Sequence, residues 1–143
     1  MTFTLDDAIR LARDAHDGQL DKGGKPYIGH PLRVMAGVGA TDEKMAAVLH
    51  DVVEDTAVTL ADLTASGCPP HVVAAVGALT HLPDEPQATY LARVAADPIA
   101  RVVKRVDIAD NLSPHRIDQL DPATRDRLRI KYATALRLLD EYA

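Results

Sequence analysis

Apolar residues recur at helical spacing along most of the chain, and alternating stretches typical of strands are scarce. In the first helical segment they follow the i, i+3, i+4, i+7 rule, at Leu5, Ala8, Ile9, Ala12 and Ala15. Thr4 is placed to cap this helix, and Asp7 completes a capping box three residues later. The pattern therefore predicts a helical protein.

Caps and prolines divide the rest of the chain into further helices. The helices expected from these signals cover residues 5–15, His30 or Pro31 to Val38, Thr41-capped 42–55, a short Thr59-capped segment, 71–79, 88–96, 98–112, and a last one after Pro122 that runs through 139. Three glycines and Pro26 mark residues 17–26 as a loop. We expect an all-α fold of about seven or eight helices, in a single domain over residues 1–143.

Composition narrows the classes of function. The formal net charge is −5, whereas binding to nucleic acid usually needs a basic face. A lone cysteine, Cys68, excludes an intrachain disulfide and favours a reducing compartment. The first residues are acidic, unlike a signal peptide, and the longest uncharged apolar run, residues 72–79, is too short to span a membrane. We expect a cytoplasmic protein that binds neither nucleic acid nor membrane, with a homodimer as the default oligomer.

The segment 46–56 carries the strongest chemical signal. Titratable residues stand there as two adjacent pairs, His50-Asp51 and Glu54-Asp55, in apolar surroundings. On one continuous helix all four side chains would share an arc of about 140°. Three carboxylates so close repel one another, so a divalent cation is expected to compensate them. The alternative is a solvated acidic face with a capping histidine, which the apolar residues before the first pair disfavour.

A metal site needs ligands from elsewhere in the chain. His30 stands at a loop-to-helix entry. Asp107 lies in an apolar stretch, and Lys104 and Asn111 share its helical face within an arc of about 60°. Two imidazoles and two carboxylates suit Mn²⁺, Fe²⁺ or Zn²⁺. We therefore expect one divalent ion with four ligands: His30, His50, Asp51 and Asp107.

Several polar residues have a structural interpretation as well. Lys104 either contacts a ligand or neutralises Asp107. His16 is expected to support the core or the neighbouring loop. The remaining histidines have no paired acids and are expected at helix ends or turns, as surface or capping residues: His71, His81 and His115.

Short motifs follow one another in order along the chain. They are His16-x-Gly18-Gln19, Lys22-x-Gly24, Pro26-Tyr27-Ile28-x-His30-Pro31, Leu49-His50-Asp51-Val52-Val53-Glu54-Asp55-Thr56, Leu79-Thr80 and Lys104-x-x-Asp107-x-x-x-Asn111-Leu112. This run resembles the hydrolase domain of RelA/SpoT-type alarmone enzymes, which are HD-domain phosphohydrolases. The resemblance covers residues 5–132. No synthetase, TGS or ACT region follows, so the chain is similar to a stand-alone small alarmone hydrolase.

The resemblance implies an all-helical HD-domain fold that binds one Mn²⁺ through His30, His50, Asp51 and Asp107. It implies that Glu54 and Asp55 form the catalytic pair. The expected reaction is release of the 3′-pyrophosphate from (p)ppGpp, with the metal lowering the pKa of a bound water and the acidic pair positioning or deprotonating it. Both acidic motifs are present, which favours an active hydrolase.

One departure from the family concerns the substrate. The family usually has Arg-Lys after the Gly-Gln turn, where this chain has Asp21-Lys22. A carboxylate there would weaken binding of a polyphosphorylated nucleotide, unless it points away or meets a base edge. Lys22 and Asn111 are the expected substrate contacts, with a solvated loop lysine and a helix cap as their alternatives. Two other functions remain open: hydrolysis of another nucleotide, such as NADPH or a nucleoside phosphate, and nucleotide sensing without turnover.

Overall fold

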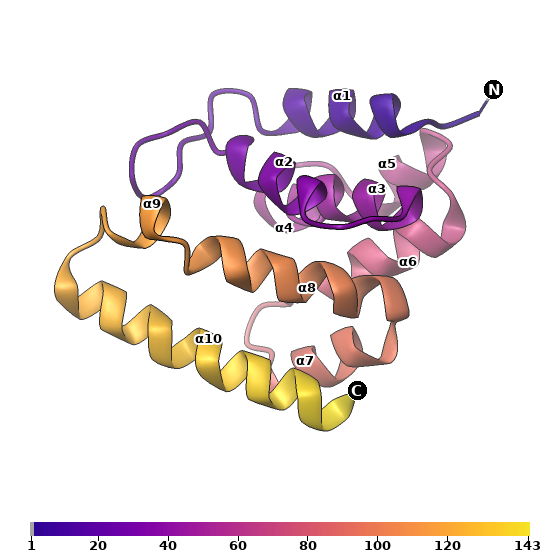
Figure 1. The fold of residues 1–143 in the computed structure, drawn as a ribbon. Coiled ribbons are helices and arrows are strands. Elements are labelled where there is room, and N and C mark those ends of the chain that lie inside the picture. The colour runs from indigo at the N-terminus through magenta and orange to yellow at the C-terminus, as the bar shows by residue number, and fades with distance from the viewer. Residues whose placement is uncertain (1) are drawn as a thin grey trace.

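The computed structural model describes residues 2–143, and Met1 lies outside them. Within that range the chain forms helices and a single isolated β-bridge, Leu20 to Pro26, so the all-α fold class is confirmed. The helices (Figure 1) are α1 Leu5–Ala15, α2 Gly29–Ala36, α3 Thr41–Leu49, α4 Val52–Asp55, α5 Leu60–Ala65, α6 Pro70–Leu79, α7 Gln87–Ala96, α8 Pro98–Asn111, α9 Pro114–Ile117 and α10 Pro122–Tyr142.

Local capping determines where several helices begin. The expected capping box of α1 is confirmed, because Thr4 and Asp7 each accept a backbone hydrogen bond from the other. Thr59 caps α5 in the same way. The expectation for Thr41 was wrong, because it is the first residue of α3 and Ala40 holds the cap position. There the Glu43 carboxylate accepts the Ala40 N–H instead, so the acidic first turn replaces the hydroxyl cap.

The residues that the structure describes form ten helices, more than the expected seven or eight. One difference is that the helix expected over 42–55 is divided into α3 and α4 by a turn at His50 and Asp51. The other is the single-turn helix α9, which Pro114 begins after α8 has ended. Proline has no N–H and suits a first helical turn, so it both ends one helix and begins the next.

Helix α8 lies in the middle of the fold. In Figure 1 it runs between α1, α2 and α3 on one side and α7 and α10 on the other. It contacts α2, α3, α6, α7 and α10. The core around it includes fully buried side chains from helices far apart in sequence, such as Leu49, Leu91 and Ile108. Polar residues on the inner side of α8 are therefore buried as well.

Cys68 belongs to this core. Burial raises the pKa of its thiol to about 11, so the thiol stays protonated and is a poor nucleophile at neutral pH.

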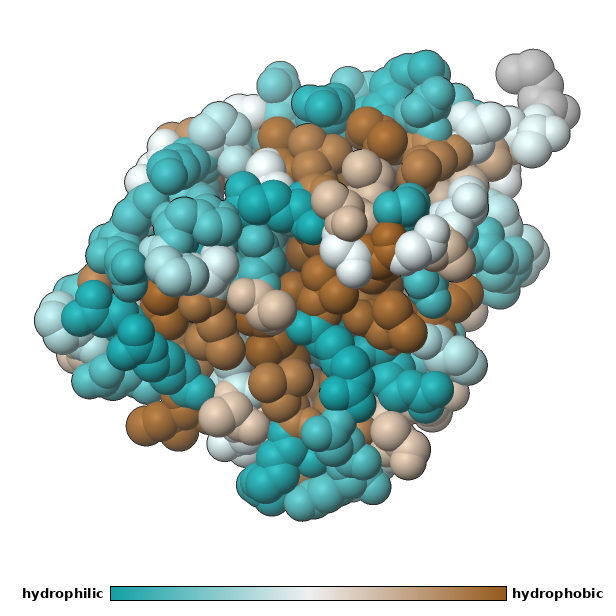
Figure 2. Space-filling model, viewed as in Figure 1, coloured by the Kyte–Doolittle hydropathy of each residue, from teal (hydrophilic) through white to brown (hydrophobic). Residues whose placement is uncertain are grey.

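The molecular surface is chemically mixed. Figure 2 shows apolar residues gathered across the middle of one face, with hydrophilic residues around them. Across residues 2–143 the large apolar side chains that are exposed are Leu20, Leu82, Ile130 and Tyr142. No helix in that range is both long enough and apolar enough to cross a membrane.

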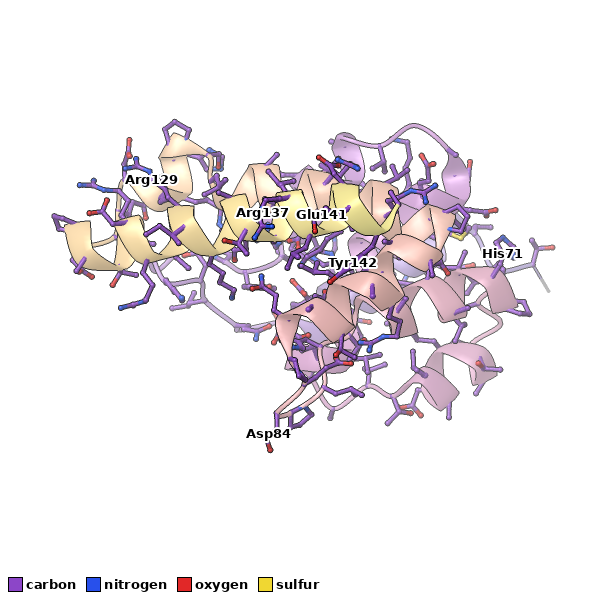
Figure 3. The ribbon with its side chains drawn as sticks, turned by 90° about the horizontal axis from the view of Figure 1, so that it is seen from below. His71, Asp84, Arg129, Arg137, Glu141 and Tyr142 are labelled. Atoms are coloured by element: carbon purple, nitrogen blue, oxygen red, sulfur yellow. The ribbon has the colours of Figure 1, made fainter. Side chains whose placement is uncertain are left out.

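The docking of α10 is open to a direct test. Figure 3 shows α10 lying across the lower side of the molecule. Leu139 is fully buried, whereas Ile130 on the same helix is 70% exposed. We expect Leu139→Ala to lower the free energy of unfolding by about 2–5 kcal/mol, because it removes buried methyl groups and leaves a cavity. The matched change Ile130→Ala should stay within about 0.5 kcal/mol in urea denaturation. Equal effects of the two changes would contradict this packing.

Candidate functional site

The turn between α3 and α4 sets the geometry of the first acidic pair. The N–H of His50 bonds to the carbonyl oxygen of Ala47, three residues back, at 3.4 Å. The ring Nδ1 of His50 donates to the same oxygen at 2.5 Å. This local competition interrupts the i to i−4 ladder. The expectation of one helical arc for both pairs was therefore wrong: His50 and Asp51 lie on a turn, and Glu54 and Asp55 on α4.

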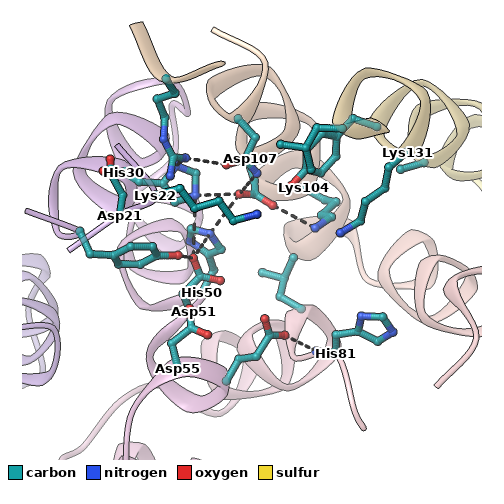
Figure 4. A pocket seen from close by; sticks show the side chains of 18 of the residues that line it. Asp21, Lys22, His30, His50, Asp51, Asp55, His81, Lys104, Asp107 and Lys131 are labelled. Atoms are coloured by element: carbon teal, nitrogen blue, oxygen red, sulfur yellow. Dashed lines mark hydrogen bonds and ion pairs between the residues drawn. The ribbon is translucent and has the colours of Figure 1, made fainter. Parts of the chain in front are cut away.

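Three buried side chains from different helices meet beside that turn. His30 lies at the start of α2, His50 follows α3, and Asp107 lies on α8 (Figure 4). One ligand atom from each lies within 4.8 Å of the others. Asp51 Oδ2 lies 3.1 Å from His50 Nε2 and 3.8 Å from His30 Nε2. The structure thus brings together the four residues that the sequence put forward as ligands.

The chemistry of these donors fits a cation. A carbonyl oxygen only accepts, so the proton of a neutral His50 ring is on Nδ1 and its Nε2 carries a lone pair. Nε2 is buried without a hydrogen bond, although it lies 3.1 Å from Asp51 Oδ2 and 3.3 Å from Asp107 Oδ1. A lone pair facing two carboxylate oxygens is unfavourable unless positive charge lies between them. Buried His30, His50 and Asp107 are able to hold a metal ion there.

Electrostatics point the same way. Burial raises the pKa of Asp107, but Lys104 and His50 outweigh it and hold that pKa well below its usual value. Burial likewise opposes the charge on Asp51, yet His50 lowers its pKa to about 2. Burial also lowers the pKa of His50, but the two carboxylates outweigh it and raise the pKa well above its usual value. The cluster keeps both carboxylates ionised and attracts a proton or another cation.

Lys104 neutralises the far side of this cluster. Its Nζ donates to Asp107 Oδ2 at 2.9 Å and lies 5.2 Å from the centre of the Tyr90 ring. Asp107 Oδ1 remains directed at the histidines, 2.9 Å from His30 Nε2. These contacts therefore favour the structural interpretation of Lys104, in which it neutralises Asp107.

The second acidic pair lies on α4 and is exposed. Asp51, Glu54 and Asp55 each offer a carboxylate oxygen within 4.8 Å of the others. Burial and the neighbouring negative charges raise the pKa of Glu54, against the hydrogen bond from His81. Burial and Asp51 also raise the pKa of Asp55. A raised pKa makes each of these carboxylates a better proton acceptor than an ordinary surface carboxylate, as a general base beside a cation site requires.

The contacts of the loop before α2 show where the carboxylate of Asp21, the departure from the family, points. Asp21 Oδ1 accepts hydrogen bonds from the backbone N–H groups of Gly23 and Lys25, each at 2.9 Å. Gly24 has a φ of 81°, a conformation that favours glycine. One oxygen of Asp21 is therefore directed at its own loop. Lys22 is exposed at the pocket, beside this turn.

Asn111 connects the cluster to α9. Its Nδ2 donates to Asp107 Oδ1 at 3.2 Å, and its Oδ1 accepts from Arg116 at 2.5 Å. Both residues line the pocket. Asn111 therefore has partners within the protein in addition to its place on the pocket wall.

Sequence reasoning missed several residues around the cluster. Tyr27 donates from its hydroxyl to Asp51 Oδ2, and its ring packs 5.0 Å from that of His16. His16 is buried and donates from Nδ1 to Gln19 at 2.6 Å, which agrees with loop support. The sequence did contain a signal for the contact of Tyr27, because Tyr27 stands inside the motif that ends in His30-Pro31.

His81 is exposed just beyond the end of α6, as expected, but it has a further role at the site. It lines the pocket, and its backbone N–H donates to Glu54 Oε1 at 2.6 Å. Its ring stacks on Tyr90 with centroids 4.5 Å apart. The adjacent Leu79-Thr80 motif was the signal for this position. By contrast, His71 is an exposed partner of Asp42, as a surface residue should be.

The four proposed ligands, the second acidic pair, Tyr27, His81 and Asn111 line one pocket of about 580 Å³. This volume lies in the range of small-molecule sites. Its lining includes the metal-type cluster, the second acidic pair, the Tyr90 and Tyr132 rings, and four cationic side chains: Lys22, Lys104, Arg116 and Lys131. A cavity lined by both acidic and basic side chains suits an anionic ligand. Its negative charge would meet the basic side chains directly and the acidic ones across a bound cation.

Known proteins resemble part or all of the chain. No model of a protein family matches it. The bifunctional (p)ppGpp synthase/hydrolase SpoT of Escherichia coli is 44% identical over 63 residues, which are 41% of this chain and 9% of that protein. A guanosine-3′,5′-bis(diphosphate) 3′-pyrophosphohydrolase of Vibrio cholerae is 49% identical over 59 residues, or 38% of this chain and 8% of that protein. The matched segments thus span less than a tenth of these relatives.

A solved structure extends the likeness to the whole fold. It is described as a metazoan ortholog of SpoT that hydrolyses ppGpp, and it is 24% identical to this chain. The two superpose with a TM-score of 0.79 over 94% of this chain and 84% of that one. The resemblance to RelA/SpoT-type hydrolases expected from the motifs is confirmed, and the fold is that of this structure.

The segment after α6, whose His81 N–H donates to the Glu54 carboxylate, gives a testable prediction. Arg93 donates to the Thr80 carbonyl at 2.8 Å and to Glu85 at 2.9 Å, and thereby fixes the segment that carries His81. We expect Arg93→Ala to speed exchange of the His81 amide hydrogen about five-fold, as the loss of about 1 kcal/mol of hydrogen bonding implies. Arg137→Ala, which removes an exposed ion pair on α10, is the control. Unchanged His81 exchange in Arg93→Ala would refute this role.

Proposed function

We propose that the chain is a metal-dependent phosphohydrolase that removes the 3′-pyrophosphate from (p)ppGpp. The observation that carries this proposal is the convergence of His30, His50 and Asp107 within one pocket, with an acidic pair on its wall. The named activities of the similar proteins supply the substrate.

The proposed ligands of the ion are His30, His50, Asp51 and Asp107. We propose Mn²⁺, since a set of two imidazoles and two carboxylates suits a borderline or hard divalent ion. When bound, this ion would stabilise negative charge on phosphoryl oxygens and lower the pKa of nearby water. Tyr27 would keep Asp51 in place through its hydroxyl.

Glu54 and Asp55 are the proposed catalytic residues. Water attacks the phosphorus next to the ribose 3′ oxygen, the bond from phosphorus to that oxygen breaks, and pyrophosphate leaves. Glu54 takes the proton of the attacking water, with its carboxylate aimed by the His81 N–H at 2.6 Å. Asp55 positions the water or relays the proton taken from it to the 3′ oxygen, which stays on the ribose as a hydroxyl group while the released pyrophosphate carries the oxygen of the water.

Lys22 and Asn111 are the proposed substrate contacts. Lys22 is exposed on a loop that lines the pocket, and we propose that it contacts a phosphate or a base edge of the substrate. Asn111 would bind a ribose or phosphate oxygen together with Arg116, its partner at 2.5 Å. We further propose a cytoplasmic location, on the basis of the lone cysteine and the small nucleotide substrate.

A second candidate is hydrolysis of a different nucleotide, such as NADPH. Asp21 favours it, because the family usually has an arginine there. The hydrogen bonds that hold one Asp21 oxygen to its own loop reduce the repulsion expected for a guanosine alarmone.

A substrate panel tests the proposal. We expect purified protein with Mn²⁺ to release pyrophosphate from ppGpp faster than it releases phosphate products from NADPH or GTP, and to lose this activity in EDTA. Faster turnover of NADPH would establish the second candidate. Binding of ppGpp without turnover in Mn²⁺ would identify a nucleotide sensor instead.

Two substitutions separate metal binding from catalysis. We expect Asp107→Ala to lose both bound metal, by elemental analysis, and hydrolysis, because it removes a buried anionic ligand. Glu54→Gln should keep the metal but lower turnover about 100-fold or more, the usual share of a general base. Glu141→Gln, at an exposed site on α10, controls for the loss of a carboxyl group. A normal rate in Glu54→Gln would remove Glu54 from the mechanism.

A further inference from the structure

Asp110 is a buried carboxylate on the inner side of α8 that the proposed reaction does not use. Its Oδ2 lies 2.6 Å from Nδ1 of His30, and the two residues are 80 positions apart in the sequence. Its Oδ1 accepts from Nε of Arg33 at 2.9 Å. We propose that Asp110 is a positioning residue that orients His30 and fixes its tautomer for metal binding. This inference rests on the metal site of the proposed function.

The tautomer follows from the contacts of His30. A carboxylate only accepts, so a distance of 2.6 Å between Asp110 Oδ2 and Nδ1 calls for a proton on that nitrogen. Arg116 Nη1 also approaches Nδ1, at 2.8 Å, and competes for this place. Arg116 has a second acceptor in Asn111 Oδ1 at 2.5 Å, whereas the carboxylate has no proton of its own to offer. The arrangement with Nδ1 protonated avoids opposing a lone pair with an anionic oxygen.

This tautomer leaves the other ring nitrogen of His30 for the cluster. Nε2 lies 2.9 Å from Asp107 Oδ1 and 3.8 Å from Asp51 Oδ2. His50 has the same arrangement, because its Nδ1 donates outward to the Ala47 carbonyl. Acceptors of this kind orient ligating histidines and raise their basicity. A carboxylate does so more strongly than a carbonyl, since hydrogen bonds to charged groups are stronger.

A purely structural role is the competing explanation. Asp110 also pairs with Arg33 at 2.9 Å and lies 3.5 Å from Arg116, so its removal takes away the ion pair of Arg33 between α2 and α8 and leaves Arg116 with Asn111 as an acceptor. The two roles differ in what else should matter. If Asp110 acts through His30, the loss of Arg33 should leave metal binding almost intact. If it acts by holding α2 to α8, the two losses should be alike.

The experiment measures the Kd for Mn²⁺ by calorimetry in the full chain. We expect Asp110→Asn to weaken binding about 10–100-fold, the usual effect of removing an outer partner of a ligating histidine. Arg33→Gln and the exposed Asp118→Asn should change the Kd less than about three-fold. Thermal unfolding in EDTA checks that each variant is folded. If Asp110→Asn does not fold, Asp110→Glu, which keeps the charge but moves the carboxylate, takes its place with the same expected loss.

A spectroscopic measurement tests the tautomer without any substitution. In wild-type protein loaded with Zn²⁺, the ¹⁵N shifts of His30 should report a proton on Nδ1. An Asp110→Asn protein that binds Mn²⁺ as tightly as wild type overturns this inference alone, whereas a proton on Nε2 overturns it and also removes that nitrogen from the proposed ligands. Equal losses in Asp110→Asn and Arg33→Gln also overturn it, in favour of the structural role. A wild-type protein that binds no Mn²⁺ overturns the proposed function as well.

Discussion

The compensation of one buried carboxylate, Asp107, organises this fold. An unpaired charge in the interior costs several kcal/mol, so every group around it must supply a proton, a hydrogen bond or positive charge. Lys104 donates to one oxygen at 2.9 Å and Asn111 donates to the other at 3.2 Å, where a cation held between that oxygen and His30 Nε2 would complete the compensation. Because α8 contacts α2 and α3, it brings this carboxylate to both histidines. The helix contacts that pack this part of the fold are therefore the same contacts that assemble the site.

The pocket contains two kinds of acidic side chain, which differ in their surroundings and in the direction of their pKa shifts. Asp51 and Asp107 are surrounded by imidazoles and, in the second case, by Lys104, and these neighbours lower their pKa values despite burial. Glu54 and Asp55 lie on α4 at the pocket wall, where partial desolvation and the neighbouring carboxylates outweigh weaker contacts with cations and hydrogen-bond donors and raise their pKa values. The first pair is suited to stay charged beside a cation, and the second to exchange protons. This division follows from a turn of only two residues between α3 and α4.

The sequence predicted much of this arrangement, and the limits have identifiable causes. Helical spacing and caps located most helices, since those signals act within a few residues. The turn at His50 escaped prediction because it depends on a ring that competes for the Ala47 carbonyl, which periodicity does not report. Motif order brought His30, His50, Asp51 and Asp107 forward together. Asp110 carried no such signal, because its role depends on a contact with a residue 80 positions away.

Asp21 stands where the family that this chain resembles usually has an arginine, and this difference has a further physical consequence. An arginine there would bring positive charge from the loop toward a ligand, whereas Asp21 bonds to its own backbone and leaves Lys22 as the cation of that turn that lines the pocket. The loop also lies against the chain after α9, because a Cβ on Gly23 would come within 1.9 Å of Gln119 Oε1. Most of the positive charge available to an anionic ligand therefore comes from helices, at Lys104, Arg116 and Lys131. Since Lys104 is committed to Asp107, the positive charge left to meet a phosphate under the proposed function would come from Lys22 on the loop together with Arg116 on α9 and Lys131 on α10.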